Sequence, residues 1–399
     1  MGKLQELALA VEPEMVELWK QLHKNPELSM KEYKTAGRLE ELLRKNTGAG
    51  RIERIGETGI WVELVGTAPW QGGEQILALR GDMDALPIQE ETGLPYASAV
   101  QGVMHACGHD VHTASLLGAV RVLENYRDRI PGRIWFFFQP GEEQMAGART
   151  FLADKRIDFS RLKAIAGIHA AGDLEVGKVR LKAGPVLASS DLVRLRVTGE
   201  EGHAAFPHKT RDPIVAAANL IVQLQTIVSR EISAIDPAVL SLGRIYGGTK
   251  DNIIAREVCI EGTLRTLNKE TRTRIQEAIR RISGGISLSL RVKVDVDIEE
   301  GALPLINDAG LVETARKGLI KAFGENNVAF AEAPGMAGED FSYFTDKMPG
   351  VFIFVGVKSE GGKPAAGHTA EFYTDPRSIR NGILTLSAFA LEYFGVNPD

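Results

Sequence analysis

The feature that most constrains the fold of this chain is an alternation of strand-like and helix-like segments that is interrupted once. Short apolar runs typical of buried strands occupy residues 59–65, 75–80, 133–138, 164–169 and 351–357. Apolar residues at helical spacing begin near His112 and recur in residues 309–323 and 376–394. Strands that alternate with helices favour a mostly parallel sheet with both faces covered.

The interruption begins near Gly184-Pro185. From there the order is strand, helix, strand, strand, helix, strand, in residues 191–198, 214–229, 239–246, 258–266, 269–282 and 288–298. This order is typical of a two-layer module of the ferredoxin-like type. We therefore predict a two-domain α/β protein. A discontinuous, mostly parallel α/β domain of residues 1–186 and 300–399 would carry an inserted ferredoxin-like α+β domain of residues 187–299.

Length and composition limit the partners and the compartment. A chain of 399 residues is too long for one ordinary core, and its net charge of −5 makes nucleic acids and acidic membranes poor partners. No apolar run approaches the roughly 18 residues of a membrane span, and the first residues do not resemble a signal peptide. Two cysteines, Cys107 and Cys259, argue against a disulfide framework. We expect a cytoplasmic protein without a membrane partner.

Potential metal ligands gather where the predicted strands end and in the loop before the helix at His112. They are Asp82, Asp84, Cys107, His109, Glu142, Glu143, His169 and His368. In open α/β sheets functional groups collect at the carboxyl ends of strands, so we expect these side chains to be neighbours. Thiolate, imidazole and carboxylate donors beside a spare carboxylate are typical of a metallohydrolase, in which some residues hold the ion and one moves protons.

Cys107 and His109 lie two positions apart in a glycine-containing turn. As a pair they could also be a buried small residue beside a histidine that caps a helix. A nucleophilic thiolate–imidazole pair is a further alternative, although residues at this spacing do not easily align for it. Asp110 favours the metal interpretation because its carboxylate could accept an imidazole N–H.

Glu142 and Glu143 discriminate best between these alternatives. Two adjacent carboxylates repel each other unless a cation lies between them or one takes a proton. A division of roles resolves the repulsion, because one carboxylate can bind the ion while the other acts as general base on a water. Two surface glutamates are the simpler alternative, but the pair follows Trp135-Phe136-Phe137-Phe138, a run that must be buried.

The remaining histidines are weaker evidence individually. His169 could equally be a hydrogen-bonded core histidine, and His368 alone would be an ordinary loop residue. Together with the other donors they support a metal site. We interpret His23 and His112 as structural and leave His208 unassigned.

Eight short runs carry a resemblance to a known family. They are LHKNPEL (22–28), GDMDALPIQ (81–89), GVMHACGHDVH (102–112), FQPGEE (138–143), GHAAFPH (202–208), LQTIVSRE (224–231), GTLRT (262–266) and GEDFS (338–342). The runs are spread over nearly the whole chain and keep the family order. The sequence therefore resembles the aminoacylase, hippurate hydrolase and auxin-conjugate hydrolase branch of the metal-dependent aminoacylase–carboxypeptidase superfamily.

The resemblance implies a catalytic α/β domain that holds two neighbouring metal ions and an inserted lid domain that forms a homodimer. The implied metal ligands are Cys107, His109, Glu143, His169 and His368, with Cys107 shared between the ions. Glu142 would be the general base, and Asp84 would orient a ligand. His203 and Asn252 of the lid would reach a site, across the dimer, to hold the scissile carbonyl and the substrate carboxylate. Arg265 is a further candidate for that carboxylate.

Three positions depart from patterns within the superfamily. His169 is followed by Ala170-Ala171-Gly172 where a bulky aromatic residue and proline are usual, so we expect a wider pocket beside this ligand. Gly141 stands where alanine is usual. In the carboxypeptidase relatives the position of Asp82 is a histidine ligand, and here His109 would supply the imidazole instead.

The resulting prediction is a metal-dependent amidohydrolase that cleaves N-acyl amino acids or similar small conjugates. Two divalent ions (zinc, manganese, cobalt or nickel) would activate a water, Glu142 would move its proton, and His203 would help to stabilise the oxyanion. The main alternative is a carboxypeptidase or dipeptidase acting on small peptides. A binding protein on an inactive hydrolase fold is less compatible with the complete ligand set, and a thiol-based redox protein would need a reactive exposed cysteine.

Overall fold

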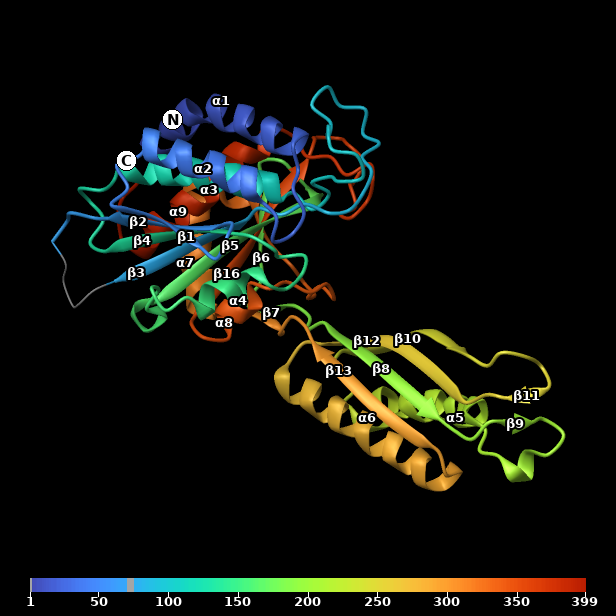
Figure 1. The fold of residues 1–399 in the computed structure, drawn as a ribbon. Coiled ribbons are helices and arrows are strands. Elements are labelled where there is room, and N and C mark those ends of the chain that lie inside the picture. Colours follow the sequence, from blue (N-terminus) through green and yellow to red (C-terminus); the bar gives the residue numbers. More distant parts are fainter. Residues whose placement is uncertain (1, 70–74) are drawn as a thin grey trace. The chain divides into compact units, whose positions relative to one another are not determined.

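Eight strands form the sheet of the part of the molecule that carries both chain ends (Figure 1). The computed structural model describes residues 2–69 and 75–399. These residues form two units. Unit 1 comprises Met1–Gly184, Ile306–Ala333 and Asp340–Asp399, and unit 2 comprises Pro185–Leu305 and Pro334–Glu339.

The sheet of unit 1 is parallel at its centre, antiparallel towards one edge and mixed towards the other. In spatial order its strands are β1 (Arg51–Ile55), β2 (Gly59–Val65), β4 (Arg133–Gln139), β3 (Ile76–Asp82), β5 (Ala164–Glu175), β16 (Gly350–Lys358), β6 (Val179–Leu181) and β15 (Val328–Phe330). Strands β4, β3, β5 and β16 pair in parallel. Their carboxyl ends therefore lie along one edge of the sheet.

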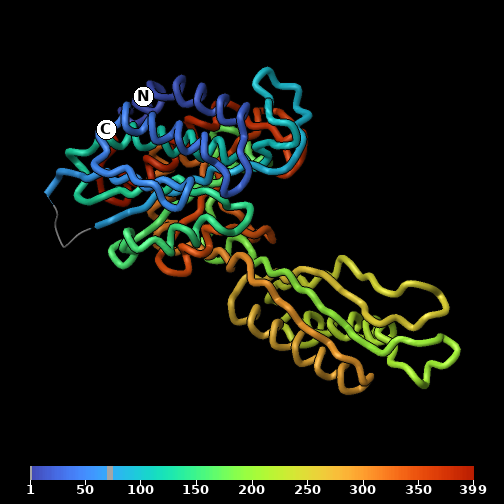
Figure 2. Tube along the Cα trace, viewed as in Figure 1, coloured from blue at the N-terminus to red at the C-terminus, as the bar shows by residue number. Residues whose placement is uncertain are grey.

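Helices cover both faces of this sheet. The larger layer contains α1 (Lys3–Lys24), α2 (Tyr33–Asn46), α3 (His109–Glu124), α7 (Ala309–Phe323) and α9 (Ser378–Tyr393). The opposite face carries the short helices α4 (Gly147–Ala153) and α8 (Ser342–Thr345), with 3-10 turns at Phe159–Arg161 and Glu325–Asn327 elsewhere in the unit. Residues near the two chain ends lie side by side (Figure 2). Gly2 is so close to Asp399 that a side chain on Gly2 would collide with it.

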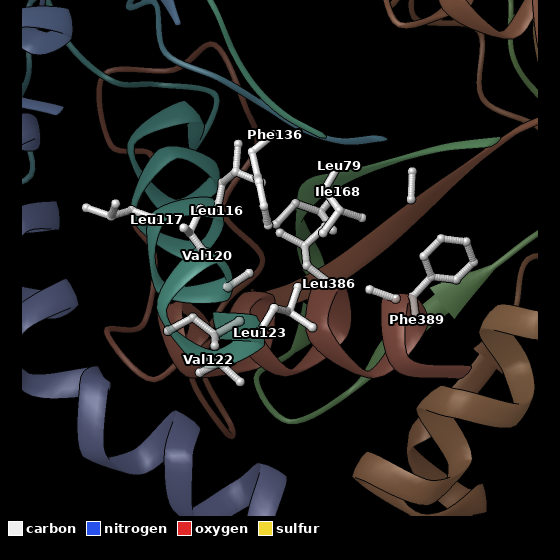
Figure 3. Packing of buried hydrophobic residues seen from close by; sticks show 14 of the residues in the cluster. Leu79, Leu116, Leu117, Val120, Val122, Leu123, Phe136, Ile168, Leu386 and Phe389 are labelled. Atoms are coloured by element: carbon white, nitrogen blue, oxygen red, sulfur yellow. The ribbon is translucent and has the colours of Figure 1, made fainter. Parts of the chain in front are cut away.

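Alternation along β4 explains how one strand serves both layers. Phe136 and Phe138 belong to the main core, and Figure 3 shows Phe136 among residues of α3 and α9. Phe137 instead packs on Phe151 of α4 and Phe344 of α8. Side chains of a strand point to opposite faces in turn, so a strand buried on both sides is apolar throughout. This accounts for the uninterrupted aromatic run that the sequence shows.

Unit 2 contains a four-stranded antiparallel sheet with two helices on one face (Figure 1). The strands, in spatial order, are β10 (Ala238–Gly247), β12 (Glu257–Thr266), β8 (Asp191–Thr198) and β13 (Lys293–Glu300). The helices are α5 (Pro213–Thr226) and α6 (Lys269–Leu290), capped by the side chains of Asp212 and Asn268. A π-helical turn follows α5 at Ile227–Glu231, and a 3-10 turn lies at Pro207–Lys209.

Two short strand pairs complete the fold. Strand β9 (Gly202–His203) pairs with β11 (Ile253–Ile254), and β14 (Leu305–Asn307) pairs with β7 (Gly184–Leu187). The predicted α/β class with a mostly parallel main sheet and a separate antiparallel module is confirmed. None of the helices in the described residues is both long and apolar enough to cross a membrane.

Two element boundaries differ from those expected. Strand β5 does not end near His169 but continues to Glu175, because it stays paired with β16 beyond that residue. Helix α6 continues to Leu290 and ends at Arg291, which adopts the left-handed conformation with φ 56°. The alternating apolar residues near 288–290 therefore belong to a helix, and the strand begins later, at Lys293.

Candidate metal centre

The proposed ligands of the α/β unit meet at the carboxyl edge of its parallel strands. Glu142 and Glu143 follow β4, and His368 lies in the loop after β16. Cys107 directly precedes the first turn of α3, where Gly108 has φ 88°. A side chain at Gly108 would collide with the Cβ atom of Ala170, so glycine is required for both the conformation and the close approach.

Of five donor groups in the described residues, three overlapping groups consist only of expected ligands and the expected base. In each group the candidate donor atoms all lie within 4.8 Å of one another. The groups are Cys107 with His109 and His169, Cys107 with Glu143 and His368, and His109 with Glu142 and Glu143. The structure thus brings together all five expected ligands and the expected base. Shared members link the groups, as two neighbouring ion sites would require.

Individual contacts define this cluster more closely. The Sγ atom of Cys107 lies 3.5 Å from Nε2 of His169, and Nε2 of His368 lies 3.2 Å from Oε1 of Glu143. Nε2 of His109 lies 4.0 Å from the same Glu143 oxygen. The backbone N–H of His368 donates to the carbonyl of Ala106 at 2.7 Å. This bond holds the loop of His368 against the loop of Cys107.

Hydrogen bonds at the far side of each ring orient two of the imidazoles. Nδ1 of His109 donates to the backbone carbonyl of Asp84 at 3.0 Å and lies 3.1 Å from its carboxylate. Nδ1 of His169 donates to the carbonyl of Ala170 at 2.9 Å. Nδ1 of each ring thus contacts a backbone carbonyl while Nε2 faces the cluster, which is the arrangement of metal-binding histidines.

Nε2 of His109 supplies the test of whether a cation fits. This atom is buried and has no hydrogen bond of acceptable geometry among the described residues. It faces the Cys107 thiol, a carboxylate oxygen of Asp82 at 3.6 Å and the Glu143 carboxylate. A buried polar atom without a hydrogen-bond partner is costly, whereas a divalent ion bound by these mixed donors would satisfy Nε2. The residues present fit a metal ion.

The pKa shifts of residues in the cluster also favour a bound cation. Burial alone would raise the pKa of the Cys107 thiol, but the charges of His169 and His109 lower it to about 6. Contact with Cys107 and Glu143 raises the pKa of His368 to about 10. The anionic groups thus draw positive charge onto the neighbouring imidazoles. A divalent cation would take over that role, since thiolates and neutral imidazoles are its ligands.

Asp82 and His112 form a further donor group with His109, which contains none of the other expected ligands. Nδ1 of His112 donates to Asp82 at 2.5 Å, and its Nε2 accepts the backbone N–H of Ala170 at 2.7 Å. Burial lowers the pKa of His112 to about 4, so the ring is neutral. Burial alone would raise the pKa of Asp82, but the charge of Arg80 holds it well below its usual range.

The two expected supporting carboxylates have different partners. Asp84 contacts Nδ1 of His109, as described above, and its other oxygen accepts the Ser29 hydroxyl and the backbone N–H of Glu143. Asp110 does accept an imidazole N–H, but from His23 at 2.8 Å and not from an expected ligand. Asp84 thus supports the ligand set directly, whereas Asp110 supports the start of α3.

The loop of the expected base is held by buried carboxylates. Glu142 is 5% exposed. The backbone N–H of Gly141 donates to Glu32 at 2.9 Å. Gly141 has φ 60°, and a side chain there would meet the sulfur of Met30 at 2.4 Å. The glycine that departs from the family pattern therefore fits both the backbone turn and the packing at this position.

The residues after His169 are small because a loop packs on them. Ala170 and Ala171 are buried, and a side chain at Gly172 would lie 1.9 Å from the carbonyl oxygen of Ala365. The N–H of Ala365 donates to the Gly172 carbonyl. The small residues after His169 were expected to leave a wider pocket. Beside Gly172 that space is occupied by the loop that carries His368. A cavity of about 700 Å³, lined by Ala365 among other residues, adjoins that loop.

The expected substrate-binding residues belong to unit 2. His203 pairs with Ile253 in the β9–β11 ladder, and the carbonyl of Asn252 accepts the N–H of Ala204. His203 and Asn252 are therefore neighbours, and both are exposed. Arg265 lies on β12 opposite Val239.

Sequence reasoning missed the buried polar residues beneath the cluster. Arg80, Gln139 and Asp340 form a hydrogen-bonded group below the base loop, and Glu32 supports the loop from the other side. Each of these residues is fully buried. Two signals pointed towards them. Asp340 lies within the GEDFS run, and Gln139 lies within FQPGEE, although neither had been given a role.

A mostly parallel α/β sheet with sulfur, nitrogen and oxygen donors at its carboxyl edge and a buried carboxylate beside them defines a metal-dependent hydrolase. Comparison with known proteins narrows this class. A family model described as peptidase family M20/M25/M40 matches residues 78–392, and the chain belongs to this family. The predicted family resemblance and the predicted enzyme class, a metal-dependent amidohydrolase, are confirmed.

Three relatives illustrate the likeness. N-acetyl-L-cysteine deacetylase of Bacillus subtilis strain 168 is 39% identical over 350 residues, which are 88% of this chain and 82% of that protein. N-acetyldiaminopimelate deacetylase of Halalkalibacterium halodurans is 35% identical over 353 residues, 88% of this chain and 93% of that protein. The crystal structure of Bacillus subtilis YXEP, a dinuclear metal-binding peptidase of family M20, superposes with a TM-score of 0.84 at 30% identity, covering 97% and 99% of the two chains.

Proposed function

We propose that this enzyme removes the acyl group from N-acyl amino acids, with N-acetyl amino acids as the first substrates to examine. The observation that carries the proposal is the position of Glu142, a buried carboxylate adjoining the five-ligand cluster. Two relatives named as deacetylases act on N-acetyl derivatives of different amino acids. The shared acetyl group suggests that the acyl side is the common element of recognition.

Five residues of unit 1 would hold the metal. They are Cys107, His109, Glu143, His169 and His368. Two divalent ions, which when bound supply Lewis-acid activation of a water and of the amide carbonyl, agree with the overlapping donor groups and with the dinuclear YXEP relative. Thiolate and imidazole donors favour zinc, while the carboxylate admits manganese, cobalt or nickel. A thiolate ligand also suits a reducing cytoplasm, where we place the enzyme.

Glu142 would move the proton in the reaction. Its carboxylate accepts a proton from the attacking water and then donates it to the leaving amine, as a general base that becomes a general acid. Glu143 cannot share this role if it binds the ion, which resolves the repulsion between the two neighbouring carboxylates. The backbone bonds to Gly141 and Glu143 keep the loop in place while the proton moves.

Residues of unit 2 would bind the substrate. We assign His203 to the scissile carbonyl and Asn252 to the substrate carboxylate, with Arg265 as a further partner for that carboxylate. These roles rest on the family resemblance. Unit 2 would also form a homodimer, because β10 is an edge strand that exposes Val239, Ile245 and Tyr246. An exposed apolar edge is a pairing surface unless another chain covers it.

The test is hydrolysis of a panel of N-acetyl and N-benzoyl amino acids beside matched dipeptides. The protein is first stripped with a chelator, and zinc, manganese, cobalt and nickel are then restored singly. Release of free amino acid from the N-acyl substrates only after metal return is expected. Glu142→Gln should lose at least about a thousandfold in kcat while its metal content stays normal. Faster cleavage of dipeptides would replace the proposal by a dipeptidase activity, and an active Glu142→Gln protein would overturn the assignment of the base.

A further inference from the structure

Asp340 connects a buried polar network to the carboxylate of Glu142. The residue is fully buried and begins the last segment of unit 1. Its backbone N–H donates to Oε1 of Glu142 at 3.3 Å. This bond joins residues 198 positions apart. The orientation of the Asp340 peptide therefore influences where the Glu142 carboxylate lies.

The side chain of Asp340 holds both ends of the loop that carries Glu142. Gln139 is the last residue of β4, and its side-chain amide donates to the two carboxylate oxygens of Asp340 at 2.8 and 3.0 Å. Ala148 lies in the first turn of α4, and its backbone N–H donates to Asp340 at 2.9 Å. Residues 140–147 span the gap between these anchors. One carboxylate thus fixes the start and the end of the loop, while the N–H of the same residue contacts its centre.

Arg80 pairs with Asp340 and aligns its carboxylate. Its guanidinium donates to Asp340 at 2.9 Å, to Asp82 at 2.7 Å and to the side-chain carbonyl of Gln139 at 3.0 Å. All four side chains are fully buried. The planar guanidinium can bridge several acceptors in fixed directions, which a lysine cannot do. Because the Arg80 guanidinium is hydrogen-bonded to all three of these side chains, the buried network has little freedom to reorient.

We propose that Asp340 is a positioning residue for Glu142, acting through its backbone N–H and through the anchored loop, and that Arg80 and Gln139 hold it in that orientation. This inference rests on the proposed role of Glu142 as the base. It assigns a function to the GEDFS run, which the ligand set and the substrate-binding residues leave unexplained. A base that must meet a water at hydrogen-bonding distance is sensitive to displacements of about 1 Å.

The test compares isosteric exchanges at two buried sites of unit 1. Asp340→Asn removes the charge while keeping the shape, and we expect kcat to fall about 10- to 100-fold, with KM and metal content unchanged. Asn307→Asp is the matched control, because Asn307 is also buried and makes three hydrogen bonds, to Lys182 and Phe352. This variant replaces an amide by a carboxylate, the opposite of Asp340→Asn, at a site outside the base loop. Similar losses of thermal stability in both proteins, with the kcat loss confined to Asp340→Asn, would support positioning.

A double-mutant cycle separates this inference from the proposed function. If Asp340 acts through Glu142, then Asp340→Asn should change kcat by less than twofold once Glu142→Gln is present. An equal loss in both backgrounds, or a kcat within twofold of wild type for Asp340→Asn alone, would overturn the positioning role even though Glu142 is the base. An active Glu142→Gln protein would instead overturn the proposed function itself.

A second variant covers the case in which Asp340→Asn does not fold. Gln139→Met removes the uncharged anchor at the start of the loop and leaves the pairing of Asp340 with Arg80. We expect a severalfold loss of kcat that also disappears in the Glu142→Gln background. A folded Gln139→Met protein with unchanged kcat would contradict the proposed anchoring of the loop.

Discussion

His23 donates a hydrogen bond from Nδ1 to the Asp110 carboxylate at 2.8 Å, although the two residues are 87 positions apart. Nε2 of the same ring lies 3.3 Å from Glu90, so the imidazole bridges two buried carboxylates. Burial alone would lower the pKa of His23, but these partners raise it to about 10. A protonated His23 therefore joins α1 to the first turn of α3, directly beside His109.

This bridge predicts a pH-dependent stability. The pKa of His23 is about 10 in the folded state and about 6.5 in an unfolded chain, so the charged bridge contributes fully below about pH 6.5. Its contribution disappears as the pH rises towards 10. Between pH 6 and pH 10 the free energy of unfolding of the wild type should fall relative to that of His23→Gln by on the order of 3 kcal/mol. Urea denaturation at pH 6, 8 and 10 measures this difference.

The control for that experiment is His208→Gln, because His208 is exposed. The difference in free energy of unfolding between the wild type and His208→Gln should not fall in this way between pH 6 and pH 10. A gap between wild type and His23→Gln that stays constant from pH 6 to pH 10 would contradict a charged bridge.

Loss of Cys107 should abolish metal binding. The thiol belongs to two of the three overlapping donor groups, so its removal weakens both ion sites. We expect Cys107→Ala to retain less than about a tenth of the wild-type metal after dialysis, as measured by elemental analysis. Cys259→Ala, on β12 of unit 2, should keep the full amount. Full occupancy in Cys107→Ala would refute the assignment of this ligand.

Removal of the metal should lower thermal stability. An ion that binds the folded chain and not the unfolded chain stabilises it by mass action, by about 4 kcal/mol at a thousand times its dissociation constant. Chelation should therefore reduce Tm by several degrees, and returning the metal should restore it. Cys107→Ala provides the comparison, because its Tm should hardly respond to chelator. Equal responses of the two proteins would place the stabilising ion elsewhere.

The packing of the His368 loop on Gly172 predicts a position-specific cost for a larger side chain. Gly172→Val would push the Ala365 carbonyl away and should destabilise the protein by about 1–3 kcal/mol, with reduced metal affinity. Gly284→Ala is the matched control. Gly284 lies in α6 with open space around it, so alanine should raise stability by about 0.5–1 kcal/mol through its helix propensity. Denaturant unfolding with metal titration distinguishes the two.

Much of the candidate site could be predicted from local patterns. The aromatic run before Glu142 marks a buried strand, and strand ends collect functional groups, so the donors could be grouped without a structure. The boundary of α6 was less accessible, because Leu288 and Leu290 fit a strand or a helix equally well. Short apolar runs carry too little periodicity to separate these alternatives.

By itself the sequence determined the alternation of strands and helices, the inserted module and the set of sulfur, nitrogen and oxygen donors, because periodicity and residue chemistry are local properties. Only the tertiary structure decided which partner each buried polar group has. Asp110 binds His23 rather than an expected ligand, and Asp340 meets Arg80 from 260 positions away. A buried charge must find its counterpart wherever the fold places one, and that pairing leaves no trace in the spacing of residues along the chain.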